Sequence, residues 1–132
     1  MSAAVTQGIR VEVTTAYQAD QSSPGAKHFV FAYTVRITNE GTLTAQLRSR
    51  HWVITDDRGT IQEVRGDGVV GVQPLLKPGQ HFEYTSSCVL KTPRGTMHGT
   101  YRIVREDGHS FDAEIAPFLL VSPAAQAPRW VN

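Results

Sequence analysis

Three glycines near the middle of the chain have the spacing of a phosphate-binding loop. Gly66, Gly68 and Gly71 form the pattern G-x-G-x-x-G within EVRGDGVVGVQPLLKPG, residues 63–79. In dinucleotide-binding proteins this pattern follows a buried strand and opens a helix, whose N-terminus holds the pyrophosphate through free N–H groups. The chemistry that this spacing could support is therefore nucleotide or pyrophosphate binding, provided that the flanking elements are present.

The residues around the glycines do not favour that chemistry. Pro74 and Pro78 follow the last glycine, and two prolines so close together exclude a helix there. Asp67 lies inside the loop, where its carboxylate would repel a phosphate. We therefore interpret the three glycines as residues that let a loop between strands turn tightly. Phosphate binding by this loop, with a dinucleoside polyphosphate as ligand, is the alternative.

Five histidines could act as metal ligands, but they are dispersed along the chain. No two of them have the short spacing of a zinc site, and the single cysteine adds only one more ligand. We expect no metal site and no cofactor, and keep a site assembled across neighbouring strands as the alternative. The histidines are His28, His51, His81, His98 and His109.

Cys88, Ser86 and Ser87 are the candidate nucleophiles. A nucleophilic cysteine needs a neighbouring base and an orienting group. The surrounding sequence, TSSCVL, is typical of a strand, in which Cys88 is a small buried apolar residue. Neither serine lies in the G-x-S-x-G pattern of a nucleophile elbow. The sequence therefore predicts a protein that is not an enzyme.

Alternation of apolar and polar residues dominates the elements that carry these side chains. A period of two over five or more residues is typical of a half-buried strand. Turn patterns that contain glycine, such as DDRG at 56–59 and EDG at 106–108, separate the alternating stretches. The alternating stretches are IRVEVTTAY, HFVFAYTVRI, HWVIT, HFEYT, TYRIV and residues 111–115.

This layout predicts an all-β fold of about seven or eight strands, arranged as an antiparallel β-sandwich of the fibronectin type III or immunoglobulin-like kind. Trp52 is predicted to be a core tryptophan. We expect a single domain over residues 9–121. Residues 1–8 and 122–132 are rich in Ala, Ser, Pro and Gln, and we expect them to be poorly ordered. Residues 18–27 are predicted to be a polar loop between the first two strands.

Composition and charge argue against several classes of function. The chain has 132 residues and a formal net charge of +1 with scattered basic residues, so we expect no nucleic-acid partner. No apolar run approaches the roughly 20 residues that cross a bilayer, so we expect no membrane insertion. The single cysteine suits a reducing compartment, and the N-terminus lacks the basic residues followed by an apolar stretch that mark a signal peptide. The sequence therefore predicts a cytoplasmic protein.

Several longer segments, taken together, resemble the bacterial ApaG proteins. The segments are YQADQSSP, FVFAYTVRITNEG, QLRSRHWVITDDRG, VRGDGVVGVQPLLKPGQHFEYTSSC and LKTPRGTMHGTYRIV. The resemblance extends from about residue 8 to residue 121 and includes the three glycines. It implies a small fibronectin type III-like β-sandwich.

The resemblance also implies a functional context. The ApaG family is connected by name with cobalt resistance and magnesium efflux, and its gene commonly neighbours that of a diadenosine tetraphosphate hydrolase. Related domains in eukaryotic F-box proteins and in a polymerase-delta-interacting protein look like interaction modules. We therefore expect a non-catalytic interaction module whose partner is another protein. Without a membrane span, such a module can influence metal efflux only indirectly.

Overall fold

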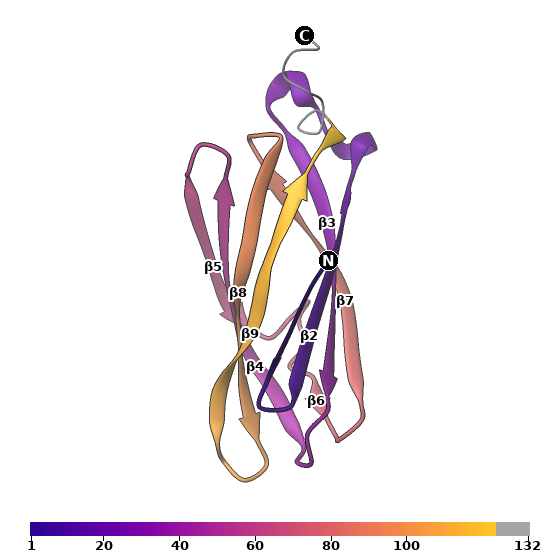
Figure 1. Ribbon diagram of the computed structural model, residues 1–132, viewed down its shortest axis with the longest axis vertical. Helices are drawn as coiled ribbons and strands as arrows, with labels where there is room; N and C mark the ends of the chain where they lie inside the picture. The colour runs from indigo at the N-terminus through magenta and orange to yellow at the C-terminus, as the bar shows by residue number, and fades with distance from the viewer. Residues whose placement is uncertain (124–132) are drawn as a thin grey trace.

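The computed structural model describes residues 1–123, and most of them lie in β-strands (Figure 1). The strands are β1 (Ser2–Thr6), β2 (Ile9–Tyr17), β3 (Phe29–Asn39), β4 (Ala45–Asp56), β5 (Ile61–Asp67), β6 (Leu75–Leu76), β7 (His81–Leu90), β8 (Arg94–Arg105) and β9 (Ser110–Val121). Two short 3-10 helices, η1 (Ala19–Gln21) and η2 (Pro24–Ala26), lie in the polar connection between β2 and β3.

The strands form two antiparallel sheets. One sheet has the strand order β1-β2-β3-β7, and the other has the order β5-β4-β8-β9, in which β6 also pairs with β4. The predicted all-β antiparallel sandwich is therefore confirmed. The described residues form nine strands where seven or eight were predicted. The small residues of β1 and the two residues of β6 have no clear alternation of their own.

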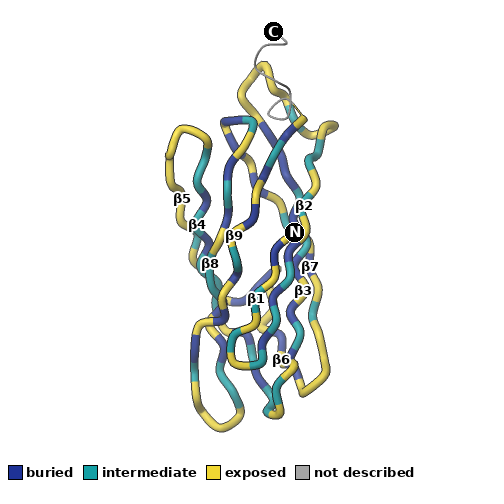
Figure 2. Tube along the Cα trace, viewed as in Figure 1, coloured by how far each residue is buried: buried dark blue, intermediate teal, exposed yellow. Residues whose placement is uncertain are grey.

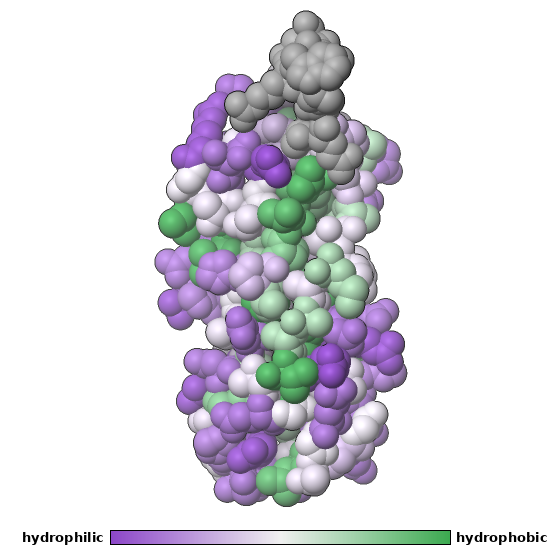
Figure 3. All heavy atoms as spheres, viewed as in Figure 1, coloured by the Kyte–Doolittle hydropathy of each residue, from purple (hydrophilic) through white to green (hydrophobic). Residues whose placement is uncertain are grey.

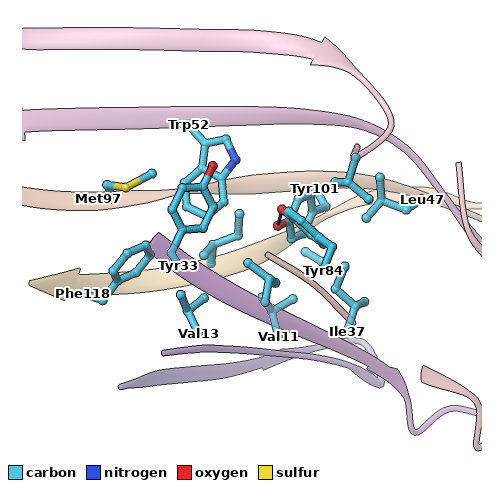
Figure 4. Packing of buried hydrophobic residues seen from close by; sticks show 14 of the residues in the cluster. Val11, Val13, Tyr33, Ile37, Leu47, Trp52, Tyr84, Met97, Tyr101 and Phe118 are labelled. Carbon is cyan, nitrogen blue, oxygen red and sulfur yellow. Dashed lines mark hydrogen bonds between the residues drawn. The ribbon is translucent and has the colours of Figure 1, made fainter. Parts of the chain in front are cut away.

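Apolar side chains from both sheets meet between the sheets and form one core (Figure 4). Buried residues alternate with more exposed ones along the strands, as the colours of Figure 2 show. Trp52 is only 2% exposed, which confirms it as a core tryptophan. Its ring lies edge-on to the rings of Tyr33, Tyr101 and Phe118, with centroid separations of 5.3, 6.1 and 5.9 Å. Aromatic pairs in this geometry stabilise a core beyond the area that they bury.

The prediction that residues 1–8 are poorly ordered is wrong. β1 and β2 form an antiparallel hairpin in which Thr6 lies opposite Ile9. Gln7 and Gly8 form the two-residue turn, with positive φ angles of 46° and 84°. A turn of this kind matches the twist of the strands that it joins. The pairing depends on backbone groups, so the small side chains of β1 do not prevent it.

The predicted tail, residues 122–132, is described only at its beginning. Ser122 is 1% exposed, and its N–H donates a hydrogen bond of 2.9 Å to the carbonyl oxygen of Pro93. This residue therefore belongs to the sandwich, which differs from the prediction of poor order there. Residues 124–132 lie outside the described residues.

The two flanks of the sandwich are built differently. On the closed flank, β1 and β9 lie side by side, and the Glu114 N–H donates to Thr6 Oγ1 over 3.0 Å. The side chains of His109 and Gln7 add a hydrogen bond of 3.1 Å there. On the open flank the edge strands are β5, which pairs with β4, and β7, which pairs with β3. In Figure 1, β5 and β7 lie at opposite sides of the view, with β1 and β9 between them.

The surface seen from the closed flank is mostly hydrophilic. Figure 3 shows a narrow strip of hydrophobic residues along the middle of this face, over the region of β1 and β9. Val5 of β1 and Leu119 of β9 are 49% and 58% exposed. Among residues 1–123, no helix has the length and apolar character needed to cross a membrane.

Candidate binding groove on the open flank

The three glycines of the G-x-G-x-x-G pattern lie at the end of β5 and in the loop that follows it. Gly66 lies opposite Arg50 of β4 in the register of the two strands. A Cβ atom on Gly66 would lie 2.7 Å from Arg50 Nη1, too close for non-bonded atoms. Glycine at position 66 therefore makes room for the Arg50 guanidinium.

Gly68 satisfies a requirement of the backbone. Its φ angle is +61°, and a Cβ atom would lie 2.1 Å from the carbonyl oxygen of Val72. Its N–H donates a hydrogen bond of 2.9 Å to the carbonyl oxygen of Arg48, which attaches the loop to β4. A side chain at position 68 would force the loop away from this position.

Gly71 and Val70 are the central residues of a tight turn. Val69 and Val72 exchange backbone hydrogen bonds of 2.8 and 3.0 Å across it. Val70 and Gly71 have φ angles of 44° and 83°, as in a type I′ turn. Val70 is strained because β-branched residues disfavour positive φ. Gly68 and Gly71 therefore occupy turn positions with positive φ, whereas Gly66 lies within β5 and not in the turn as the sequence suggested.

The loop offers few free groups to a phosphate. The N–H groups of Gly68, Val69 and Val72 already donate to backbone oxygens. The next element after the loop is the short strand β6, so the N-terminal end of a helix is not available to the three glycines. The geometry explains all three glycines without a bound nucleotide.

A β-bulge near Arg48 determines where the next arginine points. The register of β4 against β8 shifts between Leu47 and Ser49. After the shift, Arg50 lies on the same inward side of β4 as Trp52, whereas unbroken alternation from the buried Leu47 would turn Arg50 to the outer face. Bulges commonly redirect a side chain next to a functional site. The sequence pattern did not single out Arg50, because a bulge is not visible in a period of two.

Arg50 lies half-buried at the loop end of the open flank. Its Nη1 donates to the backbone oxygens of Asp67 and Gly68, each over 3.0 Å. Among residues 1–123, neither its Nε nor its Nη2 has a hydrogen-bond partner. A guanidinium has five N–H donors, so this side chain can still bind a carboxylate in two places.

A groove extends along the open flank, between β5 and β7. Two neighbouring hollows of about 320 and 370 Å³ form it, and both are lined by Ile54, Gln62 and Val89. These volumes are within the range of ligand-binding sites. Arg50 lies at one end, and Trp52 is among the apolar residues of the floor. Figure 4 shows the core from which this floor is built. The remaining lining residues are Tyr33, Val64, Ser86, Ser87, Cys88 and Met97, with Asp56, Arg58, Thr60, Leu90 and Lys91 at the far end.

The thiol and the phenols near the groove stay neutral. Burial raises the pKa of Cys88 to about 11. Burial also raises the pKa of Tyr84 and of Tyr101, whose hydroxyl groups share a hydrogen bond between the sheets. A thiolate is the reactive form of cysteine, so a pKa of about 11 makes Cys88 a poor nucleophile at neutral pH.

His51, His81 and His109 take part in separate surface contacts. His51 Nε2 lies 2.8 Å from Glu63 Oε1, and His81 Nδ1 lies 3.5 Å from Arg36 Nη2. His109 bonds across the closed flank, as described above. No cluster of three metal-ligating side chains is present in the part of the chain that the structure describes.

A third hollow, of about 620 Å³, lies on the outer face of the sheet that contains β4 and β8. Side chains of both charges line it: Arg102 Nη1 lies 3.2 Å from Asp112 Oδ1, His51 contacts Glu63, and Arg50 is shared with the groove of the open flank. Exposed pairs of both signs give no preference for a ligand of one charge. The groove on the open flank is therefore the stronger candidate site.

The arrangement defines an antiparallel β-sandwich with one closed flank and one grooved flank. The model of the ApaG domain family matches residues 19–105, well over half of the chain. The chain belongs to the ApaG domain family.

Relatives and solved structures agree with this assignment. The chain is 59% identical over 125 residues to the protein ApaG of Anaeromyxobacter dehalogenans strain 2CP-C, which covers 95% of this chain and 98% of that protein. It is 59% identical over 115 residues to the protein ApaG of Thiobacillus denitrificans, covering 87% of this chain and 91% of that protein. The crystal structure of the putative ApaA protein from Bordetella pertussis is similar, with a TM-score of 0.85 and 58% identity over 87% of this chain and 94% of that one.

Proposed function

We propose that this protein is a non-catalytic interaction module that binds another protein through the groove on its open flank. The observation that carries the proposal is the groove itself, which combines an apolar floor, two unpaired strand edges and the half-buried Arg50. Sites of this kind bind partners through buried apolar anchors with a few polar groups that fix orientation.

The chemistry of the groove supports binding rather than catalysis. Cys88 is protonated at neutral pH, and the groove has no histidine among its lining residues to serve as its base. Ser86 and Ser87 likewise have no base beside them in this lining. Arg50 can orient an acidic group through the N–H donors of its guanidinium.

Nucleotide binding by the glycine loop is the second candidate, and its geometry gives it less support. The loop uses most of its N–H groups internally, and Asp67 adds a negative charge beside them. A ligand that binds only the folded state raises the melting temperature. We expect millimolar dinucleoside polyphosphate, with or without magnesium, to leave the melting temperature unchanged; a clear rise would favour the second candidate.

A module of this kind would act in the cytoplasm through its partner. The effect on cobalt and magnesium handling that the family resemblance implies would then be indirect, carried by the bound protein. Residues 1–123 contain no cluster of three metal-ligating side chains that would support a direct role in metal binding.

Site-specific photo-crosslinking in cells tests the proposal. A photoreactive residue replaces Gln62, which is exposed at the edge of the groove, and in a matched control it replaces Thr14, which is exposed on the outer face of the other sheet. We expect a defined protein adduct from position 62 and none from position 14. An adduct from position 14 alone would leave an interaction module with a different site, and the absence of any adduct from either position would contradict the proposal.

A further inference from the structure

We infer that the groove takes an extended peptide segment that bears an acidic side chain, and that the segment adds to the edge of β7 as a new strand. The inference rests on the proposed function and specifies the partner of the same site. It depends on three features: the free backbone groups of β7, the apolar floor beside them, and the positive charge of the groove.

The backbone of β7 presents hydrogen-bonding groups toward the groove. The Asn39 N–H donates to the Gln80 oxygen, and the Gln18 N–H donates to the Val30 oxygen. Because bonded pairs alternate along antiparallel strands, these two bonds fix the direction of every peptide group in β3 and β7. The residues of β7 whose N–H and C=O groups point away from β3 are His81, Glu83, Thr85, Ser87 and Val89.

The edge of β7 has little protection against strand addition. Natural edge strands are commonly blocked by proline, lysine, a bulge or a covering segment. β7 has the sequence HFEYTSSCVL, without proline or lysine, and pairs with β3 in unbroken register over ten residues. Four consecutive residues, Ser86 to Val89, line the groove, which places the edge of the strand and not only one of its faces at the groove wall. An extended peptide can therefore bond to this edge along its length.

The apolar floor of the groove favours apolar side chains at alternate positions of the added strand. Side chains of a strand alternate between its two faces, so every second residue of the peptide would face Trp52, Cys88 and Met97. These three residues are 2%, 7% and 1% exposed. A peptide with small or medium apolar residues at alternate positions fits this floor.

The charge of the groove selects an acidic segment. Arg50, Arg58 and Lys91 line it, and Asp56 is its single acidic residue in the lining. Asp56 Oδ1 accepts hydrogen bonds from the N–H groups of Arg58 and Thr60 in its own turn, which occupies that carboxylate oxygen. Charge complementarity therefore favours an Asp or Glu beside Arg50. The chain's own residues 124–132 carry Arg129 and no acid, so a segment of another protein is the better match.

Selection from a phage-displayed library of random peptides of about 12 residues, panned on the full chain, tests the inference. We expect selected peptides with an Asp or Glu and alternating apolar residues. Replacing that acid by its amide should weaken binding to the unmodified protein by about tenfold and binding to Arg50→Gln much less, since the two groups form one ion pair. Selected peptides without an acid, or equal losses for both proteins, would overturn the acidic assignment.

Two substitutions of Ser87 test strand addition. Ser87→Pro removes an N–H that points away from β3, and proline is tolerated on an edge strand when its position faces outward. Ser87→Ala keeps the N–H and is the matched control. We expect Ser87→Pro to bind the selected peptide about tenfold or more weakly than Ser87→Ala does. Equal affinities for the two variants, both with cooperative melting, would overturn the inference.

The peptide selection and the crosslinking experiment fail independently. A protein adduct at position 62 without any selected peptide would leave the interaction module standing and overturn the extended-peptide partner. Failure of both would overturn both. Should Ser87→Pro melt without cooperativity, the paired measurement with Arg50→Gln and the amidated peptide still decides the acidic contact.

Discussion

The closed and open flanks of the sandwich differ in how the edges of the two sheets are covered. Both are places where a sheet ends and leaves backbone groups unpaired. On the closed flank, Thr6 Oγ1 accepts a hydrogen bond from the Glu114 N–H, and a His109–Gln7 hydrogen bond joins the turns next to these strands. On the open flank, large side chains such as Trp52 cover the interior, and no other strand within residues 1–123 pairs with the outer edge of β7. Both flanks protect the core, but within residues 1–123 only the open flank has a strand edge beside the groove proposed as the binding site.

The loop with the three glycines belongs to the open flank and shapes one end of it. Gly66 admits the guanidinium of Arg50, and Gly68 and Gly71 allow the turn that holds the loop against β4. Glycines with the spacing of a phosphate-binding loop thus help to place the positively charged side chain of Arg50 at the end of the groove. The spacing of glycines alone does not define their chemistry.

The largest effect should come from the floor of the open flank. Trp52→Ala removes a buried ring that contacts Tyr33, Tyr101 and Phe118. We expect a loss of about 3–5 kcal/mol in the free energy of unfolding, measured by urea denaturation. Trp52→Phe, which keeps much of the packing, should lose less. An unchanged urea midpoint for the alanine variant would show that the floor does not depend on this ring.

The next effect separates two glycines of one loop. Gly68→Ala places a methyl group against the Val72 oxygen, whereas a Cβ at Gly71 meets nothing within 4 Å, and both residues have positive φ. We expect Gly68→Ala to cost about 2 kcal/mol or more and Gly71→Ala about 1 kcal/mol, from backbone strain alone. Urea midpoints of both variants provide the comparison. The reverse order would contradict the geometry of the loop.

The pH dependence of the free energy of unfolding should reveal the contribution of the buried Cys88 thiol on the open flank. Burial raises the pKa of Cys88 from 9.0 to about 11, so the folded state holds the thiol proton more tightly than the unfolded state. This stabilisation is complete below pH 9 and is lost as the pH rises toward the folded-state pKa of about 11. Between pH 8 and pH 11, the unmodified protein should lose about 2 kcal/mol more of its free energy of unfolding than Cys88→Ala loses.

Cys88 is not among the causes of the raised pKa of Tyr84 and Tyr101, so the comparison with Cys88→Ala removes the effect of these two tyrosines. The same pH dependence in both proteins would show that the thiol is not desolvated as the structure has it.

The smallest effect compares the two edges directly. Thr6→Ala removes the acceptor of the Glu114 N–H on the closed flank. Ser87→Ala removes an exposed hydroxyl on the open flank. We expect a loss of about 1 kcal/mol for Thr6→Ala and almost none for Ser87→Ala, measured as shifts of the urea midpoint. Equal losses would mean that the hydrogen bond does not hold the closed flank together.

The sequence could predict much of the fold because alternation reports which side of a strand is buried. Trp52 and the inward faces of β2 and β3 follow directly from it. Residues 1–8 were predicted wrongly because β1 pairs through its backbone and its small side chains give no periodic pattern. The two-residue β6 is too short for any period to show.

The candidate site was harder to predict, for physical reasons. Arg50 points inward only because of the bulge near Arg48, and its place beside Gly66 depends on the register of two strands. The groove forms between β5 and β7, which belong to different sheets. A local sequence pattern does not determine how far apart the edges of two different sheets lie. The turn glycines were within reach, since the prolines after them already excluded a helix.

Residue-resolved hydrogen exchange along β7 tests the central claim most directly. In the free protein, the outward amides of Glu83, Thr85 and Ser87 should exchange fast and those of their even-numbered neighbours slowly. Saturation with a selected acidic peptide should slow the outward amides by about tenfold or more and leave the neighbours almost unchanged. Slowing on the closed flank, or along β7 without this alternation, would contradict strand addition at the groove.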